Sequence, residues 1–417
     1  MNDPSIRIEG GYSLNGEVLL SGAKNAALPL LAAACLGKEP TFLENVPVCL
    51  NDVKLMINLL NDMGASVEVN GTTAQCCRAN FPRNNVPSDA HKIRSSLLLL
   101  GMVAGLKGEI FIPQPGGCQI GDRKHDLHLV GLQALGAQAE DQPVGIYLRS
   151  KRLSGSPIDF YLPTTSGSEN VMIAASLAEG YTILRNANTR PEVVQLGHLL
   201  QCMGANIKMQ SRIVEIEGVK ELRGGAHFTV MPGWDEAVTY IAAAGMTRGE
   251  IVIRNLNLDS IKEDARYLRE TGIELFSWQN DLYVSGKNAK NPFDLFTGPY
   301  PAVNSDMQPI FTALALTLNG ASTITDLRFT ERFQYIDEIK KFGADIEVFG
   351  NTAIVRGGTK LVGTQVSATD IRGGISVVLT GLVAEGVTIV DNLYQIERGY
   401  ECFIDKFTRL GARIEYN

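Results

Sequence analysis

The chain has 417 residues, of which 45% are hydrophobic and 20% are charged, and its formal net charge is −7. This length can support a large core spread over more than one domain. The negative charge argues against nonspecific nucleic-acid binding, and no apolar run is long enough to span a membrane. The N-terminal residues contain no signal-peptide core. We therefore expect a cytoplasmic protein that acts on small molecules, without nucleic-acid or membrane partners.

The cysteines are odd in number and form no CxxC motif. They are Cys35, Cys49, Cys76, Cys77, Cys118, Cys202 and Cys402. A disulfide framework and a zinc site both need more regular spacing. We therefore expect reduced thiols and no metal ion.

One pattern recurs six times along the chain. A helix-like segment ends in a glycine, and a short alternating strand follows, as in 60–69 and 339–348. A glycine directly after a helix is the usual C-terminal cap. The six glycines are 68 to 72 residues apart: Gly64, Gly136, Gly204, Gly272, Gly343 and Gly411.

A second pattern alternates with the first. It consists of an Ala- and Leu-rich helix, a glycine and a β-branched strand, as in 26–45 and 236–255. Because these helices are apolar on nearly every face, we expect them to be buried, with the more charged helices of the first pattern nearer solvent. Six units of two helices and several strands predict a mixed α/β or α+β repeat fold. Periodicity alone allows two domains of three units, dividing near Val230, or one ring of six.

Cations stand at the expected starts of three buried helices. Lys24, Arg94 and Arg372 are each placed where the helix macrodipole disfavours positive charge. Each cation alone is compatible with a solvated surface position. Together, at related points of repeated units, they indicate an anion site, since helix N-termini bind phosphates and carboxylates.

A glycine-rich loop carries a cysteine and an arginine. Cys118 lies between Gly117 and Gly121, and Arg123 follows five residues after the cysteine. A nearby guanidinium favours the thiolate, which suits a nucleophile or proton donor. A buried, inert thiol is the alternative. Arg332 and Arg398 lie in further loops and could grip carboxylate or phosphate groups.

These residues together resemble the enolpyruvyl transferases. Within them, the chain is similar to the branch that acts on UDP-N-acetylglucosamine in peptidoglycan (cell-wall) synthesis, the targets of fosfomycin. The similarity covers nearly the whole chain and is most specific in 14–36, 115–128, 331–347 and 396–412. It implies two inside-out, barrel-like α/β domains of three βαβαββ repeats each. One domain is then 22–230, carrying the cysteine loop at 111–126, and the other is 1–21 plus 231–417.

The resemblance also implies a reaction and roles. Phosphoenolpyruvate is the co-substrate, with no metal or other cofactor, and its enolpyruvyl group passes to the 3-hydroxyl of the sugar nucleotide. Cys118 is the general acid that protonates the methylene carbon, and Asp306 takes the proton of the hydroxyl. Asn25 orients the intermediate. The residues implied to hold phosphoenolpyruvate are Lys24, Arg123 and Arg398, with Arg332 and Arg372 nearby. The other residues implied to bind substrate are Arg94, Lys124, His125, Asp126, Leu127, Thr165, Ser166, Gly167, Arg328 and Asp370.

Several positions on the expected sugar-nucleotide side differ from the usual family pattern. They are Lys124, His125, Thr165, Trp234, Arg328 and Glu331. These differences leave open the same transfer to another nucleotide or sugar hydroxyl in a specialised pathway. A metabolite sensor without activity is a further alternative, although the expected acid, base and cations are all present.

Overall fold

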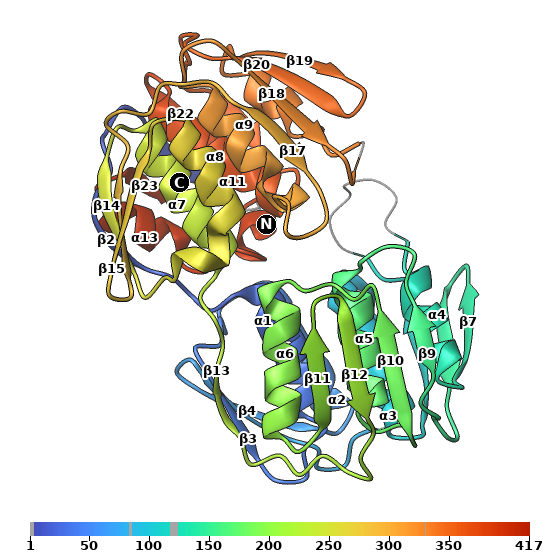
Figure 1. Cartoon of the computed structure of the whole chain (residues 1–417). Helices are drawn as coiled ribbons and strands as arrows, with labels where there is room; N and C mark the ends of the chain where they lie inside the picture. The colour runs from blue at the N-terminus through green and yellow to red at the C-terminus, as the bar shows by residue number, and fades with distance from the viewer. Residues whose placement is uncertain (1–3, 83–85, 117–123, 330) are drawn as a thin grey trace. The chain divides into compact units, whose positions relative to one another are not determined.

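The computed structural model describes residues 4–82, 86–116, 124–329 and 331–417. The described residues form two compact units (Figure 1). Residues 22–82, 86–116 and 124–231 form one, the mid-chain unit. Residues 4–21, 232–329 and 331–417 form the other, the split unit. Two expected site residues, Cys118 and Arg123, lie outside the described residues.

The mid-chain unit holds three sheets. The first has the order β13 (His227–Thr229), β3 (Thr41–Glu44), β5 (Thr73–Cys77) and β4 (Ser66–Asn70). The second has the order β9 (Pro157–Asp159), β10 (Tyr181–Arg185), β12 (Ile213–Glu217) and β11 (Asn206–Gln210). The third has the order β6 (Glu109–Pro113), β8 (Gly145–Arg149) and β7 (Gln138–Gln142).

The split unit also holds three sheets. One has the order β2 (Asn15–Leu19), β14 (Glu250–Arg254), β16 (Asp281–Ser285) and β15 (Glu274–Trp278). Another has the order β17 (Asp294–Thr297), β18 (Ala321–Asp326), β20 (Thr352–Arg356) and β19 (Asp345–Phe349). The last has the order β21 (Gln365–Ser367), β22 (Val387–Asp391), β1 (Ile6–Glu9) and β23 (Arg413–Tyr416).

All five four-stranded sheets are built alike. A parallel pair of strands is extended by two further strands that pair antiparallel, as in β9–β10 and β12–β11. Where the two parallel strands are consecutive in the chain, as in β9–β10, β17–β18 and β21–β22, a buried helix connects them, because a parallel connection must cross over one face of the sheet. The six-fold repetition and the mixed α/β fold predicted from the sequence are therefore confirmed.

The apolar helices form the centre of each unit. They are α1 (Lys24–Ala34), α3 (Leu98–Gly105) and α5 (Thr165–Ala175) in the mid-chain unit, and α7 (Trp234–Met246), α9 (Gln308–Ala315) and α11 (Ile371–Val383) in the split unit. Nearly every residue of these helices is buried. In Figure 1 the sheets lie outside them, the reverse of a domain with a central sheet. Removing this much apolar surface from water is the main force holding each unit together.

The second helix of each repeat is only half buried. These helices are α2 (Asn51–Asp62), α4 (Asp126–Ala134), α6 (Pro191–Cys202), α8 (Lys262–Glu270), α10 (Ile336–Lys340) and α13 (Phe403–Arg409), with a short α12 (Tyr394–Glu397) before the last. The glycine that follows each has a positive φ, between 89° for Gly343 and 102° for Gly204. Glycine adopts this conformation without strain, so the predicted C-terminal caps are confirmed.

Two strands are exchanged between the units. β2 leads into α1 but pairs in parallel with β14 of the split unit. β13 leads into α7 but pairs in parallel with β3 of the mid-chain unit. In each unit, one repeat is therefore completed by a strand that directly precedes a helix of the other unit. The chain passes from one unit to the other between β2 and α1 and between β13 and α7.

Four short 3₁₀ turns are described, and one of them alters a predicted helix start. They are η1 (Ser88–Lys92), η2 (Arg94–Leu97), η3 (Leu258–Ile261) and η4 (Ser305–Met307). Arg94 therefore opens a 3₁₀ turn ahead of α3, whereas Lys24 and Arg372 lie in the first turns of α1 and α11 as predicted.

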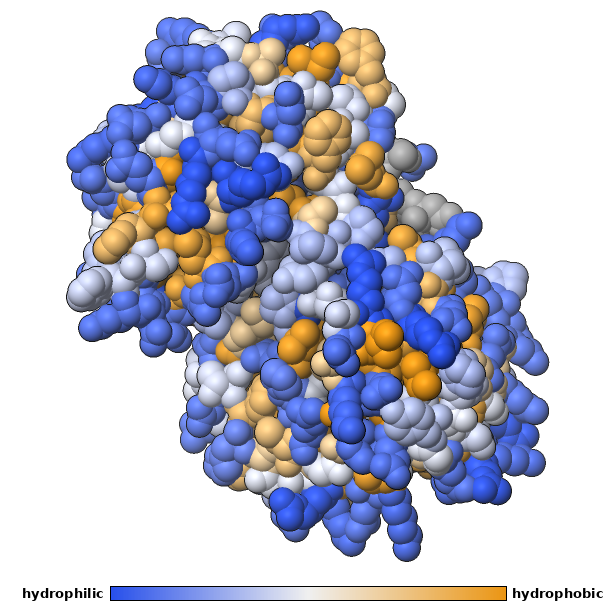
Figure 2. Space-filling model, in the orientation of Figure 1, coloured by the Kyte–Doolittle hydropathy of each residue, from blue (hydrophilic) through white to orange (hydrophobic). Residues whose placement is uncertain are grey.

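The face drawn in Figure 2 is mainly hydrophilic, with small apolar groups between the hydrophilic ones. Within the described ranges, no helix is both long and apolar enough to cross a membrane.

Candidate active site

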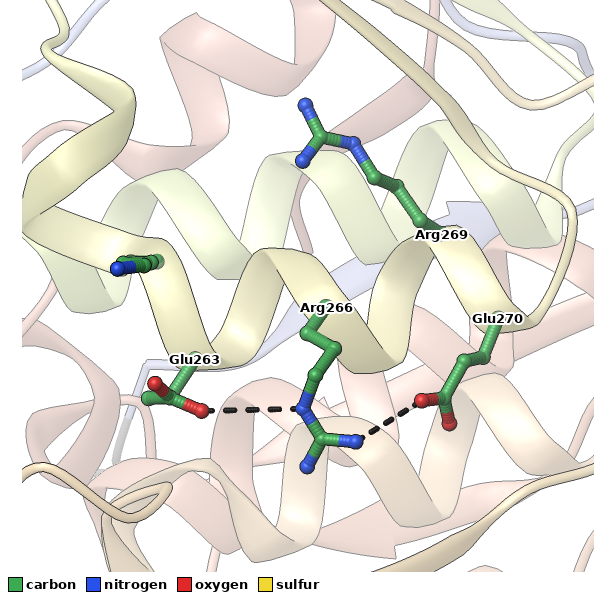
Figure 3. Close-up of a pocket in the computed structure, with 5 residues that line it drawn as sticks. Glu263, Arg266, Arg269 and Glu270 are labelled. Carbon is green, nitrogen blue, oxygen red and sulfur yellow. Dashed lines mark hydrogen bonds and ion pairs between the residues drawn. The ribbon is translucent and has the colours of Figure 1, made fainter.

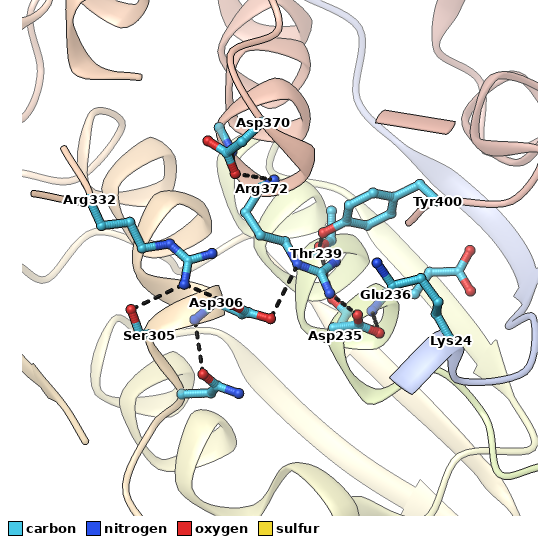
Figure 4. Close-up of polar contacts among 12 residues, drawn as sticks. Lys24, Asp235, Glu236, Thr239, Ser305, Asp306, Arg332, Asp370, Arg372 and Tyr400 are labelled. Atoms are coloured by element: carbon cyan, nitrogen blue, oxygen red, sulfur yellow. Dashed lines mark hydrogen bonds and ion pairs between the residues drawn. The ribbon is translucent and has the colours of Figure 1, made fainter. Parts of the chain in front are cut away.

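An aspartate and an arginine meet at the N-terminal end of α9. Arg332 donates from Nη1 to Asp306 Oδ1 at 2.7 Å and to Ser305 Oγ at 3.2 Å (Figure 4). Arg332 is buried, whereas about a quarter of the Asp306 side chain is exposed, at 27%. The charge-assisted contact fixes one carboxylate oxygen and so holds a partly exposed carboxylate in one position.

A second, fully buried carboxylate supports this pair. Asp326 accepts hydrogen bonds from the hydroxyls of Thr297, at 3.0 Å, and of Ser305. It also accepts from the backbone N–H groups of Arg328 and Phe329, both at 2.9 Å. Asp326 thus anchors Ser305 under Arg332 and shapes the loop that follows β18. These multiple donors offset the cost of burying its charge.

Arg372 brings a second guanidinium to Asp306. It is buried, donates from Nη2 to Asp235, and has Nε 3.9 Å from Asp306 Oδ2. Its guanidinium also lies over the ring of Tyr400, 5.1 Å from the ring centre. Burial favours the neutral form, but the charges of Asp235 and Asp306 outweigh it and raise the pKa of Arg372.

The first turn of α11 places this arginine. Asp370 caps the helix by accepting from the N–H groups of Arg372, at 3.0 Å, and Gly373, at 3.3 Å. An N-cap carboxylate satisfies donors that the helix leaves open. Asp370 therefore acts on the helix backbone and its neighbour Thr369, and it orients Arg372 through the backbone.

Several buried donors here have no hydrogen-bond partner among the described residues. They are Nε of Arg332, Nη1 of Arg372 and the side-chain amide of Gln308. A buried, unsatisfied donor is costly unless a ligand or water completes it. Two arginines with a spare N–H beside a partly exposed carboxylate can bind an anionic oxygen and accept a proton at the same place.

The remaining predicted cations of the split unit differ in exposure. Arg398 is buried and donates from Nη1 to Gln395 Oε1 at 3.0 Å. Arg328 has an exposed side chain whose guanidinium lies 5.3 Å from the ring centre of Phe329. Burial mainly raises the pKa of Tyr400, to about 12, so its hydroxyl stays protonated and shares a hydrogen bond with Thr239 at 2.9 Å.

In the mid-chain unit, Lys24 is paired with a carboxylate. Its Nζ lies 3.2 Å from Asp52 Oδ2, and both side chains are 9% exposed. Asp52 lies in the first turn of α2, and its charge offsets the unfavourable place of Lys24 at the start of α1. Asn25, the next residue of α1, is half-buried.

Residues 124–127 lie before and within the first turn of α4. Arg94 donates from Nη2 to the carbonyl of Lys124 at 2.9 Å. His125 Nε2 lies 2.9 Å from Asp141 Oδ2, and Asp126 accepts from the hydroxyl of Tyr161 at 2.7 Å. Lys124 is exposed and Leu127 is buried. Arg94 therefore contacts the start of this segment, and Asp126 belongs to it, in the same unit.

The first turn of α5 brings together three more predicted residues. Thr165 Oγ1 accepts from Asn188 Nδ2 at 3.1 Å, and Ser166 Oγ lies 3.0 Å from Nε2 of the buried His128. At Gly167 a Cβ atom would lie 2.5 Å from Thr164 Cγ2, so the turn has no room for a side chain there.

The structure thus groups the predicted residues by unit. Those of the split unit are Asp306, Arg328, Arg332, Asp370, Arg372 and Arg398. Those of the mid-chain unit are Lys24, Asn25, Arg94, Lys124, His125, Asp126, Leu127, Thr165, Ser166 and Gly167. Sequence reasoning did not identify Asp235, Asp326 or Asp52 as partners of these groups. Asp52 and Asp235 lie in the first turns of helices and Asp326 ends a strand, and pairing across repeats gives no local signal.

The helix α8 carries a shallow depression of a different kind, about 550 Å³ in volume (Figure 3). Its lining is Lys262, Glu263, Arg266, Arg269 and Glu270. Arg266 is paired with Glu263 at 3.7 Å and with Glu270 at 2.9 Å, which is typical of a solvated helix face.

Within the described part of the chain, no group of three or more His, Cys, Asp or Glu residues could hold a metal ion.

The sequence matches a family model described as EPSP synthase (3-phosphoshikimate 1-carboxyvinyltransferase) over residues 8–407. The chain belongs to this family of enolpyruvyl, or 1-carboxyvinyl, transferases.

Its relatives point to one branch. The chain is 41% identical to the UDP-N-acetylglucosamine 1-carboxyvinyltransferase of Coxiella burnetii, over 98% of this chain and 94% of that protein. It is 39% identical to the protein of that name from Thermodesulfovibrio yellowstonii, over 98% and 99% of the two chains.

Two solved structures share the fold. The enolpyruvyl transferase NikO from Streptomyces tendae has a TM-score of 0.90 at 22% identity, covering 100% of this chain and 99% of its own. EPSP synthase from Acinetobacter baumannii has a TM-score of 0.77 at 17% identity, covering 99% and 100%. At these identities the similarity concerns the fold alone.

Proposed function

We propose that this protein transfers the enolpyruvyl group of phosphoenolpyruvate to the 3-hydroxyl of UDP-N-acetylglucosamine, with release of phosphate. The observation that carries the proposal is the 39–41% identity, over nearly the full length, to proteins named for this reaction. In this role the protein supplies a precursor of peptidoglycan.

Asp306 is the proposed general base. Its carboxylate is fixed on one side by Arg332 and lies near Arg372, and it is partly exposed. It accepts the proton of the sugar hydroxyl as the oxygen bonds to the substituted carbon of phosphoenolpyruvate. A proton must reach the methylene carbon in the same addition, and Cys118 is the proposed acid.

The second step reverses the proton movement. The tetrahedral intermediate loses phosphate, its methyl group loses a proton, and the carbon–carbon double bond forms again. Negative charge grows on the leaving phosphate, so cations that meet it lower the barrier. We assign this role to Lys24, Arg123 and Arg398, with Asn25 orienting the intermediate. The chemistry as proposed uses only acid, base and charge, with no metal ion or cofactor.

The sugar nucleotide is assigned to the first turns of α4 and α5 and to Arg328. The two turns present Lys124, His125 and Asp126 together with Thr165, Ser166 and Gly167 in the mid-chain unit. Backbone N–H groups at helix starts and exposed polar side chains suit a diphosphate and a sugar.

The test is phosphate release from phosphoenolpyruvate in the presence of UDP-N-acetylglucosamine. Turnover that depends on both compounds supports the proposal. A parallel panel of nucleotides and sugars reads out other acceptors. Phosphate release with another acceptor and none with UDP-N-acetylglucosamine would refute the proposed acceptor, and no release with any acceptor would refute the proposed activity.

A further inference from the structure

A buried histidine in the mid-chain unit has no role in the chemistry proposed above. His128, in α4, is only 2% exposed. Its two ring nitrogens face two residues of α5: Nδ1 lies 2.9 Å from Asn170 Nδ2, and Nε2 lies 3.0 Å from Ser166 Oγ. The histidine therefore connects a fully buried amide to a hydroxyl at the partly exposed start of a helix.

The orientation of the amide is determined by the backbone. Gly101 donates its N–H to Asn170 Oδ1 at 2.8 Å, and Asn170 Nδ2 donates to the carbonyl of Leu97 at 3.0 Å. A backbone N–H can only donate and a carbonyl can only accept, so the oxygen and nitrogen of the amide cannot be exchanged. A Cβ on Gly101 would lie 2.1 Å from Asn170 Oδ1, so glycine is needed for this close approach.

The amide in turn determines the form of the histidine. The second hydrogen of Asn170 Nδ2 points to His128 Nδ1, so Nδ1 must accept. A neutral imidazole that accepts at one nitrogen carries its proton on the other. Burial, with the charges of Arg94 and His125, lowers the pKa of His128 to about 3, so the ring is neutral at neutral pH. Nε2 therefore carries the proton and donates it to Ser166 Oγ.

This donation leaves the proton of Ser166 for another partner. The Ser166 hydroxyl makes no other hydrogen bond to a described residue. It is half-buried in the first turn of α5, where the helix favours electron-rich oxygen. We propose that His128 is a positioning residue that holds the Ser166 hydroxyl as a donor to an oxygen of the sugar nucleotide. This inference rests on the proposed function, and it adds a specificity role for a residue that does not touch the substrate.

The test compares two replacements of the histidine with removal of the hydroxyl. His128→Asn keeps an acceptor for Asn170 but cannot reach Ser166, whereas His128→Gln can place an N–H near the position of Nε2. We expect His128→Asn and Ser166→Ala each to raise KM for UDP-N-acetylglucosamine about tenfold, the effect of one lost hydrogen bond. The KM for phosphoenolpyruvate should change less than about twofold, and His128→Gln should restore most of the affinity.

The double variant decides whether the two residues act together. In the Ser166→Ala background, His128→Asn should have little further effect, because the hydroxyl that it positions is already gone. The inference would be overturned if the two substitutions raised KM for UDP-N-acetylglucosamine additively, or if His128→Gln had as high a KM as His128→Asn. Either result would leave the proposed function in place. His198→Asn, on the exposed face of α6, is the matched control.

A spectroscopic measurement tests the network without turnover. Nitrogen NMR of the imidazole rings in the whole protein should show His128 neutral, with the proton on Nε2, down to about pH 4. A proton on Nδ1 would overturn the inference whatever the kinetics. Wild-type protein that releases no phosphate with any acceptor would instead overturn the proposed function and, with it, the ligand assigned to Ser166.

Discussion

Arg332 holds one oxygen of the Asp306 carboxylate at 2.7 Å, while the second oxygen lies 3.9 Å from Arg372. Two buried guanidiniums therefore fix the position of a single, partly exposed carboxylate. Each arginine still has a buried N–H group with no partner among the described residues. Such a site keeps its geometry before the substrate arrives, which lowers the cost of reorganisation during reaction.

The first prediction concerns this carboxylate. Asp306→Asn keeps the shape and the contacts of Asp306 but cannot accept the proton of the hydroxyl. We expect kcat to fall about 100-fold or more, with a lower thermal midpoint as well, because the buried Arg332 loses its charged partner. Steady-state phosphate release and thermal unfolding measure the two quantities. A kcat within about fivefold of the wild type would show that another group is the base.

The second prediction concerns the buried ion pair of Arg372 and Asp235. Asp235→Ala leaves a buried guanidinium with only the weaker contact to Asp306, 3.9 Å away, so the free energy of unfolding should fall by about 3 kcal/mol. Denaturant unfolding followed by circular dichroism measures it.

Glu270→Ala is the control for that pair. It removes an exposed partner of Arg266 on α8, in the same unit, and should cost about 0.5 kcal/mol or less. If the two variants unfold at the same denaturant concentration, the buried pair does not contribute as its burial implies.

The third prediction is a pH dependence caused by Glu169 in α5. Burial, and then the charge of Glu192, raise the pKa of Glu169 to about 8. In the unfolded chain this group loses its proton near pH 4.5, but in the folded protein it keeps it. Its contribution to stability is therefore complete below about pH 4.5 and is lost as the pH rises toward 8, by a few kcal/mol.

Glu169→Gln should remove this slope and make the protein more stable than the wild type at pH 8. Unfolding free energies at pH 5, 6.5 and 8 measure the effect, with the exposed Glu140→Gln as the matched control. Parallel pH profiles for wild type and Glu169→Gln would contradict the assignment.

The fourth prediction compares two glycines that end helices of the split unit. Gly272 and Gly343 have φ values of 97° and 89°, so alanine is strained at both. At Gly272 a Cβ would also lie 2.3 Å from the carbonyl oxygen of Asn288, whereas at Gly343 the nearest atom, Lys360 O, is 3.5 Å away.

Gly343→Ala should therefore cost about 1–2 kcal/mol, the cost of the left-handed conformation alone. Gly272→Ala should cost clearly more, because the backbone must also move. Equal losses of unfolding free energy in the two variants, measured by chemical denaturation, would show that the backbone around Asn288 moves without an energetic cost.

Much of the fold follows from local sequence. A glycine after a half-polar helix fixes a left-handed cap, as at Gly64 and Gly411, and the spacing of these caps reveals the repeat. Apolar residues on nearly every face of a helix require burial, as in α1 and α3. Both are short-range effects of backbone conformation and the hydrophobic effect, so the sequence alone predicts them.

Local sequence does not predict the exchange of β2 and β13 between the units. Each strand precedes one helix and pairs beside another, and the choice of partner depends on edges formed by β14 and β3, far away in sequence. No local pattern distinguishes the exchanged strands from the others, because a parallel edge accepts any strand of suitable pattern.

The candidate site divides in the same way. The sequence by itself determined which charged side chains stand at helix starts and loops, among them Lys24, Asp306 and Arg372. Only the tertiary structure decided their partners: Asp52 for Lys24, Arg332 for Asp306 and Asp235 for Arg372. The physical reason is the distance along the chain over which each effect acts. Helix caps and burial patterns are set by residues within a few turns of one another, whereas a buried charge is satisfied by whichever group the packing of separate repeats brings within hydrogen-bond distance.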